Sequence, residues 1–184
     1  MLYLRTLLFL ERSDQAMTFE EQLIELLSSV PPWLATVILS TLPVSELRGA
    51  IPIAIGVYGL SPIETYMLAV MGNLLPVIPL LLFLGPVSDY LRRFRLGDIF
   101  FTWLFTRTHR KHSIHFEKYG TLALALFVAI PLPITGVWTG CAAAFVFGIK
   151  FKHSLIAIMA GVLTAGLIVT LLTIAGVSIM QSMV

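Results

Sequence analysis

Apolar residues in this chain form runs of unequal length, and these lengths predict its architecture. Residues 32–42 and 47–58 would each give a helix of roughly 16–18 Å, which is too short for the hydrocarbon core of a bilayer, about 30 Å thick. The run at 62–84 would reach about 34 Å and can cross that core. We therefore expect a re-entrant hairpin followed by one spanning helix, since irregular backbone at membrane depth is tolerated where protein buries it.

The same order of segments returns in the second half of the chain. Residues 121–130 and 137–149 are short apolar runs, and 154–178 is long enough to span. Matching positions indicate an internal repeat: Leu34-Ala35 with Leu122-Ala123, Pro43 with Pro131, Gly49 with Gly136, and Gly59 with Gly148. The predicted fold is an all-α integral membrane protein with two inverted repeats, each a re-entrant helical hairpin followed by one spanning helix. Its parts are an N-terminal segment at 1–30, repeat 1 at 31–84, a basic connector at 85–118 and repeat 2 at 119–178.

Composition and charge place these elements in a membrane. The chain is 58% hydrophobic and has a mean hydropathy of +0.93, which excludes an ordinary soluble domain. Nine of the 12 Lys and Arg residues lie in 85–118 and 150–153, so the positive-inside rule makes both segments cytoplasmic and both termini extracytoplasmic. Segments 85–118 and 150–153 can both lie on the cytoplasmic side only if the second repeat is inverted relative to the first. We expect a multi-pass protein of the cell (inner) membrane, with the connector lying as an amphipathic segment at the interface.

The N-terminal segment divides at Met17. Residues 1–16 lack the pattern that follows, and we expect them to be dispensable. Thr18 and Glu21 form a capping box that predicts an amphipathic helix at the membrane surface.

The first spanning helix carries its own boundary and break signals. Ser61 is predicted to cap its start, with Glu64 at the third helical position serving the same helix end. Pro76 and Pro79 predict a kink. Asn73, which precedes them, is interpreted as bridging helices in preference to reaching a cavity.

Two formal charges, Glu46 and Arg48, interrupt an apolar run that extends from residue 33 to residue 60. A charge at the bilayer centre costs roughly 2.5–3.5 kcal/mol, so the pair predicts either a substrate or ion site or a buried ion pair that fixes the hairpin. Positive helix ends at both hairpin tips and the planar fork of Arg48 suit an anion, and Glu46 can hold a proton. The candidate binding residues are Glu46, Arg48, Ser45, Gly49, Thr135, Gly136, Trp138 and Thr139, and those expected to shape the hairpins are Pro43, Pro52, Pro131 and Pro133. Capping of broken helix ends is an equal alternative for the three hydroxyl residues of this set, and packing is favoured for Trp138.

No catalytic, metal or cofactor site is predicted. Cys141 has no histidine near it in the sequence and no second cysteine for an internal disulfide. His109, His112 and His115 are spaced for one helix face, but the cationic side chains between them disfavour a metal ion. We expect a protein that is not an enzyme and binds no nucleic acid.

Two strings carry a family resemblance: Leu-Pro-Val-Ser-Glu-Leu-Arg-Gly-Ala-Ile-Pro at 42–52 and Ile-Pro-Leu-Pro-Ile-Thr-Gly-Val-Trp-Thr-Gly at 130–140. Together they resemble the small multidrug export protein family over about residues 17–178, and that family is distantly similar to the DedA/VTT membrane proteins. The resemblance implies a membrane transporter or lipid-carrier flippase for an anionic or amphipathic substrate, with proton coupling. A small-molecule or multidrug exporter and a non-transport membrane scaffold are the alternatives. The expected partners are the lipid bilayer and an anionic lipid or small-molecule substrate. Gly161, Ala165 and Gly166 permit close helix packing, either within the chain or with a second copy in a homo-oligomer.

Overall fold

The computed structural model describes residues 27, 29–91, 93, 114–131 and 136–182. The chain divides into two compact units, Met1–Pro31 and Pro32–Val184, and every helix named below belongs to the second. In the first unit the backbone N–H of Val30 donates to the carbonyl of Leu27 at 2.9 Å, which closes a turn. The surface helix predicted after Met17 and most of the basic connector, 94–113, lie outside the described residues.

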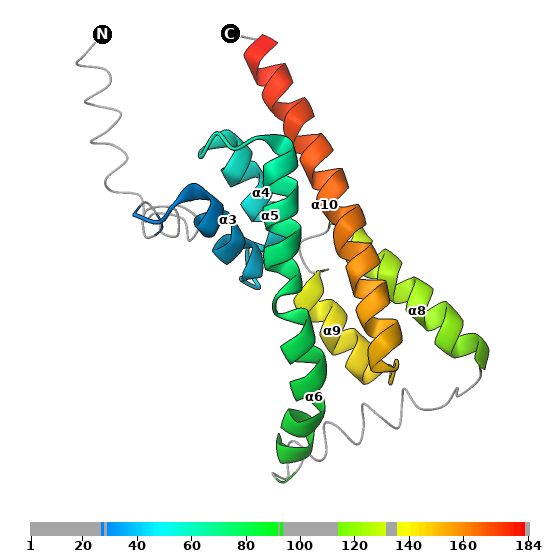
Figure 1. The fold of residues 1–184 in the computed structure, drawn as a ribbon. Coiled ribbons are helices and arrows are strands. Elements are labelled where there is room, and N and C mark those ends of the chain that lie inside the picture. The colour runs from blue at the N-terminus through cyan, green and yellow to red at the C-terminus, as the bar shows by residue number, and fades with distance from the viewer. Residues whose placement is uncertain (1–26, 28, 92, 94–113, 132–135, 183–184) are drawn as a thin grey trace, which may run out of the picture. The chain divides into compact units, whose positions relative to one another are not determined.

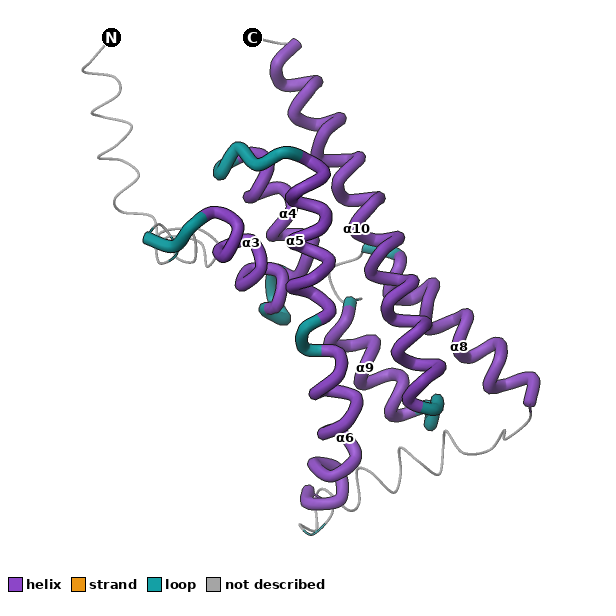
Figure 2. The backbone as a smooth tube through the Cα atoms, viewed as in Figure 1, coloured by secondary structure: helices purple, strands orange, loops and turns teal. Residues whose placement is uncertain are grey.

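Helices make up the second unit, and the described residues contain no strand (Figures 1 and 2). The all-α prediction is therefore confirmed for the part of the chain that the structure describes. In chain order the helices are α3 Pro32–Thr41, α4 Glu46–Gly56, α5 Pro62–Leu74, α6 Val77–Leu91, α8 Ile114–Ala129, α9 Val137–Val146 and α10 Phe151–Ser182.

Among the described residues, two helical segments are long and apolar enough to cross a membrane: Pro62–Val87 and Phe151–Ile179. They contain the two spans predicted from the sequence. The predicted cap is confirmed at the first of them, where the Ser61 hydroxyl accepts a hydrogen bond from the backbone N–H of Glu64 at 3.3 Å. Pro62 occupies the start of this helix, where its missing N–H has no intrahelical partner to lose.

The first span is broken between α5 and α6. Pro76 has no N–H, so it cannot bond the carbonyl of Gly72 one turn earlier. The Thr41 hydroxyl donates to that carbonyl at 2.9 Å, and α6 resumes at Val77. Pro76 and Pro79 were predicted to kink this span; the structure interrupts the helix at Pro76, and Pro79 lies in the first turn of α6.

Each span packs closely against the short helix that begins its own half, and a glycine lies at both contacts. α3 packs on α5, where a Cβ on Gly72 would come within 2.5 Å of the carbonyl oxygen of Val37. α8 packs on α10, where a Cβ on Gly161 would come within 2.6 Å of the Cβ of Val128. The absence of a side chain therefore brings the helices of each pair together.

The second short helix of each half packs against the span of the other half. α4 contacts α10 as well as α5, and α9 contacts α6 as well as α10. The α5–α6 span and α10 are antiparallel (Figure 1). The core where these elements meet includes Leu47, Ile51, Val137, Ile158 and Val162.

The two halves also match in local backbone geometry. The turns after α4 and α9 each contain a left-handed glycine, Gly59 with φ +67° and Gly148 with φ +65°. The first turns of the helices match as well, but with a different alignment from the one expected. The N–H of Gly49 donates to the carbonyl of Ser45 and that of Gly140 donates to the carbonyl of Gly136, both at 2.8 Å. The first turns of α4 and α9 therefore align Gly49 with Gly140, whereas the sequence alignment pairs Gly49 with Gly136.

Candidate functional site

The site begins at the turn between α3 and α4, which places Glu46 at the start of α4. Glu46 has φ +45° and is the only residue other than glycine with positive φ in the described part of the chain. Its N–H donates to the carbonyl of Leu42 at 3.0 Å, and the buried Ser45 hydroxyl donates to the carbonyl of Leu39. A bulky residue in this conformation costs of order 1–3 kcal/mol, and such strain concentrates at functional sites.

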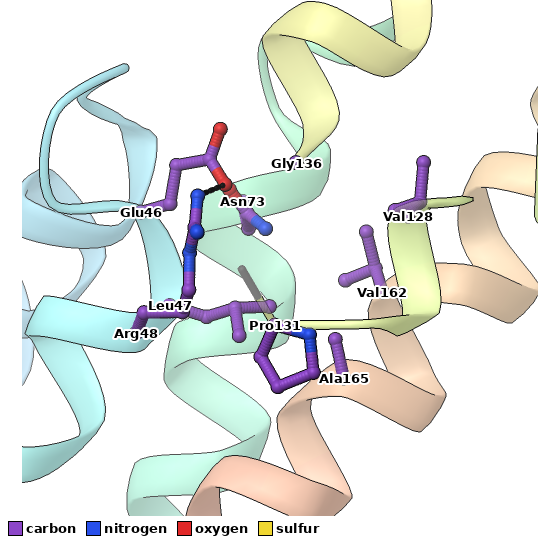
Figure 3. A pocket seen from close by; sticks show the side chains of 9 residues that line it. All are labelled: Glu46, Leu47, Arg48, Asn73, Val128, Pro131, Gly136, Val162 and Ala165. Atoms are coloured by element: carbon purple, nitrogen blue, oxygen red, sulfur yellow. Dashed lines mark hydrogen bonds and ion pairs between the residues drawn. The ribbon is translucent and has the colours of Figure 1, made fainter. Parts of the chain in front are cut away.

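The Glu46 carboxylate lies at the N-terminus of α9. The backbone N–H groups of Val137 and Trp138 hydrogen-bond to it, and the Arg48 guanidinium donates through Nη2 to Oε2 at 3.3 Å (Figure 3). Glu46 is 4% exposed. Helix N-termini bind anions because their first N–H groups lack partners and the dipole is positive there. In this protein, its own carboxylate occupies that position.

Gly136 makes this approach possible. A Cβ on Gly136 would overlap the Glu46 carboxylate. The backbone of Gly136 is extended, with φ 172°, so any residue could adopt its conformation. The requirement for glycine here is therefore steric, and it exists because the carboxylate is present.

A small cavity opens beside the ion pair (Figure 3). The volume open to the centre of a water molecule in this cavity is about 10 Å³, so the cavity holds about one water. Residues from α4, α5, α8, α10 and the segment between α8 and α9 line it: Glu46, Leu47, Arg48, Asn73, Val128, Pro131, Gly136, Val162 and Ala165. The cavity therefore lies where α4, α8 and the segment before α9 meet α5 and α10.

Two polar atoms in the cavity lining are buried without a hydrogen-bond partner among the described residues: Nη1 of Arg48 and Oδ1 of Asn73. Asn73 is 1% exposed. Burying such a group unsatisfied costs about 1–3 kcal/mol, more when it is charged, so each marks a place that a ligand or water can fill. Nη1 of Arg48 is a donor, and Oδ1 of Asn73 is an acceptor.

Of the residues predicted to bind substrate, the structure brings Glu46, Arg48 and Gly136 together. Three others direct their polar groups to the backbone. The Ser45 hydroxyl bonds Leu39, the Trp138 indole Nε1 donates to the carbonyl of Thr41 at 3.2 Å, and the Thr139 hydroxyl accepts from the N–H of Gly136 at 3.0 Å. These contacts match the capping alternative for the hydroxyls. Gly49 packs against the Cβ of Ser45, and Thr135 lies outside the described residues.

The prolines divide in the same way. Pro43 lies in the turn between α3 and α4, and Pro131 lines the cavity just after α8. Pro52 was expected to shape a hairpin but lies inside α4, which continues past it to Gly56. Pro133 is outside the described residues.

Asn73 is the cavity residue that sequence reasoning assigned elsewhere. It was expected to bridge helices, but it lines the cavity shared with Glu46, and its side-chain oxygen has no hydrogen-bond partner among the described residues. The available signal was an amide in an apolar span three residues before a helix-breaking proline. Among the described residues, no three His, Cys, Asp or Glu side chains are grouped to hold a metal ion.

One comparison with known proteins gives a match. A family model described as "Putative small multi-drug export protein" matches residues 46–168, which begin at Glu46 and include the whole cavity lining. No curated protein and no solved structure shows a significant match to the chain. The expected likeness to DedA/VTT proteins is not shown by these comparisons.

Proposed function

Because the chain belongs to the family described as putative small multi-drug export proteins, we propose that it exports a small molecule across a membrane through the cavity beside Glu46 and Arg48. One observation carries this proposal. A buried ion pair, an unsatisfied donor and an unsatisfied acceptor converge between two helices long enough to span. Intramembrane charges are costly and mark substrate or ion pathways. The family description points away from an enzyme.

The proposed architecture is the pair of inverted re-entrant hairpins expected from the sequence, in a multi-pass protein of the inner membrane. Opposed span directions, matching left-handed glycines and the contacts of α4 with α10 and of α9 with α6 support it. Transporters with such repeats place the substrate near the midplane, at the ends of broken helices. In this arrangement the hairpin tips act as the two gates, and the connector 85–118 is cytoplasmic.

The test is flux in proteoliposomes that contain the full chain. Efflux of organic anions, cationic dyes and a fluorescent anionic lipid would be compared, each normalised to folded protein. Arg48→Lys keeps the charge but loses the planar fork, and Glu46→Gln keeps the shape but loses the charge. We expect both to lower flux per folded molecule at least tenfold. Gly176→Ala is the control, because nothing lies within 4 Å of the added Cβ.

The outcomes separate the candidate functions. Flux of a dissolved small molecule supports export, and movement of the lipid alone supports the flippase alternative. If neither moves, the scaffold alternative stands. If both variants match the unaltered protein in flux per folded molecule, the ion pair is structural and the cavity beside it is not the export site.

A further inference from the structure

We infer that Glu46 is a built-in substitute for the substrate, which is an amphipathic molecule bearing a carboxylate or a similar oxyanion. The substrate anion takes the place of the Glu46 carboxylate at the N-terminus of α9, and Glu46 takes up one proton in exchange. The inference rests on the proposed export function and names its substrate class.

The binding position for the anion is already formed. A carboxylate there receives the N–H groups of Val137 and Trp138 and one arm of the Arg48 guanidinium. The second arm, Nη1, is buried and has no partner in the part of the chain that the structure describes. An incoming anion with two or more oxygens can accept hydrogen bonds from the helix end and from both Nη1 and Nη2 of Arg48. The Glu46 carboxylate bonds Nη2 only. A cationic substrate would meet Arg48 and a positive helix end, so this site disfavours cations.

Asn73 supplies the second, independent indication. Asn73 lines the same cavity, and its Oδ1, an acceptor, is buried without a donor from any described residue. Ionised Glu46 has no hydrogen to give, whereas protonated Glu46 has one O–H donor. Once displaced, protonated Glu46 can turn toward Asn73 and satisfy it. The carboxylate-bound state leaves two atoms unsatisfied, and the exchanged state gives both a partner.

Charge balance requires the proton. The ionised pair of Glu46 and Arg48 is neutral, so an anion arriving alone would leave a net charge of −1 in a buried site, which is costly. One proton from solution, bound to the displaced carboxylate, keeps the site neutral. Anion and proton then move together, and the transported unit carries no net charge.

The groups around Glu46 allow this assignment. Arg48 faces it from α4 and Cys141 from α9. α3 carries no titratable or charged residue. The titratable and charged residues of α5, α8 and α10 lie in the first two turns of each helix. These helices line the cavity further along, with Asn73, Val128 and Val162. Glu46 is therefore the group placed to take the proton.

The first experiment is chemical rescue of Glu46→Ala, which vacates the helix end. Thermal unfolding in detergent would be followed while acetate is added, with acetamide as the neutral isostere and methylammonium as the cation. We expect acetate alone to raise Tm, by about 3–6 °C at ten times its dissociation constant. Unaltered protein, in which Glu46 must first be displaced and protonated, should show a smaller rise in Tm at the same acetate concentration. Equal effects of acetate and acetamide would overturn the inference.

The second experiment measures the proton. Indole-3-acetate, benzoate and octanoate would be titrated calorimetrically at pH 7.5 in two buffers of different ionisation enthalpy. Uptake of about one proton per anion is expected for the unaltered protein and none for Glu46→Gln, which should still bind. Binding without proton uptake, preference for the cation tryptamine, or failure of every carboxylate would refute the exchange. Glu46→Gln keeps the side-chain shape, so this arm holds if Glu46→Ala does not fold.

These binding measurements are independent of export. If rescue and proton uptake occur but nothing is transported, the export proposal fails and the anion site stands. If dyes are exported while rescue and proton uptake are both absent, the substrate assignment fails and export stands.

Discussion

Gly136→Ala is the sharpest perturbation of this site, because it acts on one contact only. The added Cβ would occupy space now filled by the Glu46 carboxylate. A carboxylate at the end of a flexible side chain can swing away, so the overlap itself need not persist. What is lost is its pair of hydrogen bonds to the N–H groups of Val137 and Trp138.

The expected cost follows from those two bonds. Hydrogen bonds to a charged group contribute about 1.5–3 kcal/mol each. Water entering the vacated space recovers part of the sum, so we expect Gly136→Ala to lower the free energy of unfolding by about 2–4 kcal/mol. Gly176→Ala, with open space around its Cβ, should change it by less than about 1 kcal/mol.

A double-mutant cycle with Glu46→Ala isolates the contact. Without the carboxylate there is nothing for the new Cβ to displace, so Gly136→Ala should cost no more than about 1 kcal/mol in that background. The assay is unfolding in mixed detergent micelles, followed by tryptophan fluorescence. Additive costs of the two substitutions would show that the carboxylate does not lie against Gly136, and the site described above would be wrong.

Three further outcomes are expected. Gly72→Ala should lower the free energy of unfolding in detergent by about 1–3 kcal/mol, because the added methyl group is overpacked against the Val37 carbonyl. Gly85→Ala, with no neighbour within 4 Å, should not lower it, and equal costs for the two substitutions would contradict the packing. Trp138→Phe should lower the free energy of unfolding by about 1 kcal/mol in the same assay, because the indole hydrogen bond is lost. An unchanged free energy would show that this bond does not stabilise the fold. A cysteine replacing Ser88 should resist an impermeant thiol reagent in intact cells and react after the cytoplasmic side is opened; labelling in intact cells would reverse the topology.

Features encoded within a few residues were predictable from the sequence. The spans follow from run length and apolarity, and the cap at Ser61 and the break at Pro76 follow from local chemistry. The charges of Glu46 and Arg48 were identifiable because an apolar segment makes them costly.

The arrangement of the site required contacts between distant parts of the chain. No sequence rule indicates that Glu46 meets the N–H groups of Val137 and Trp138, or that Gly136 is needed to admit the carboxylate. Asn73 was assigned to helix bridging because an amide in a span has many available partners. Only its position in the cavity shows that its oxygen lacks one.

The contact between Glu46 and α9 has a consequence for how the protein is made. Glu46 leaves the ribosome about 90 residues before the helix end that receives its carboxylate, a delay of roughly 5–20 s at ordinary rates of synthesis. Throughout that interval the first hairpin holds a charge whose backbone partners do not yet exist. The span that covers α4, α10, is made after α9. The first half of the chain must therefore wait at the membrane in an incomplete state, and its site closes only when α10 has been inserted.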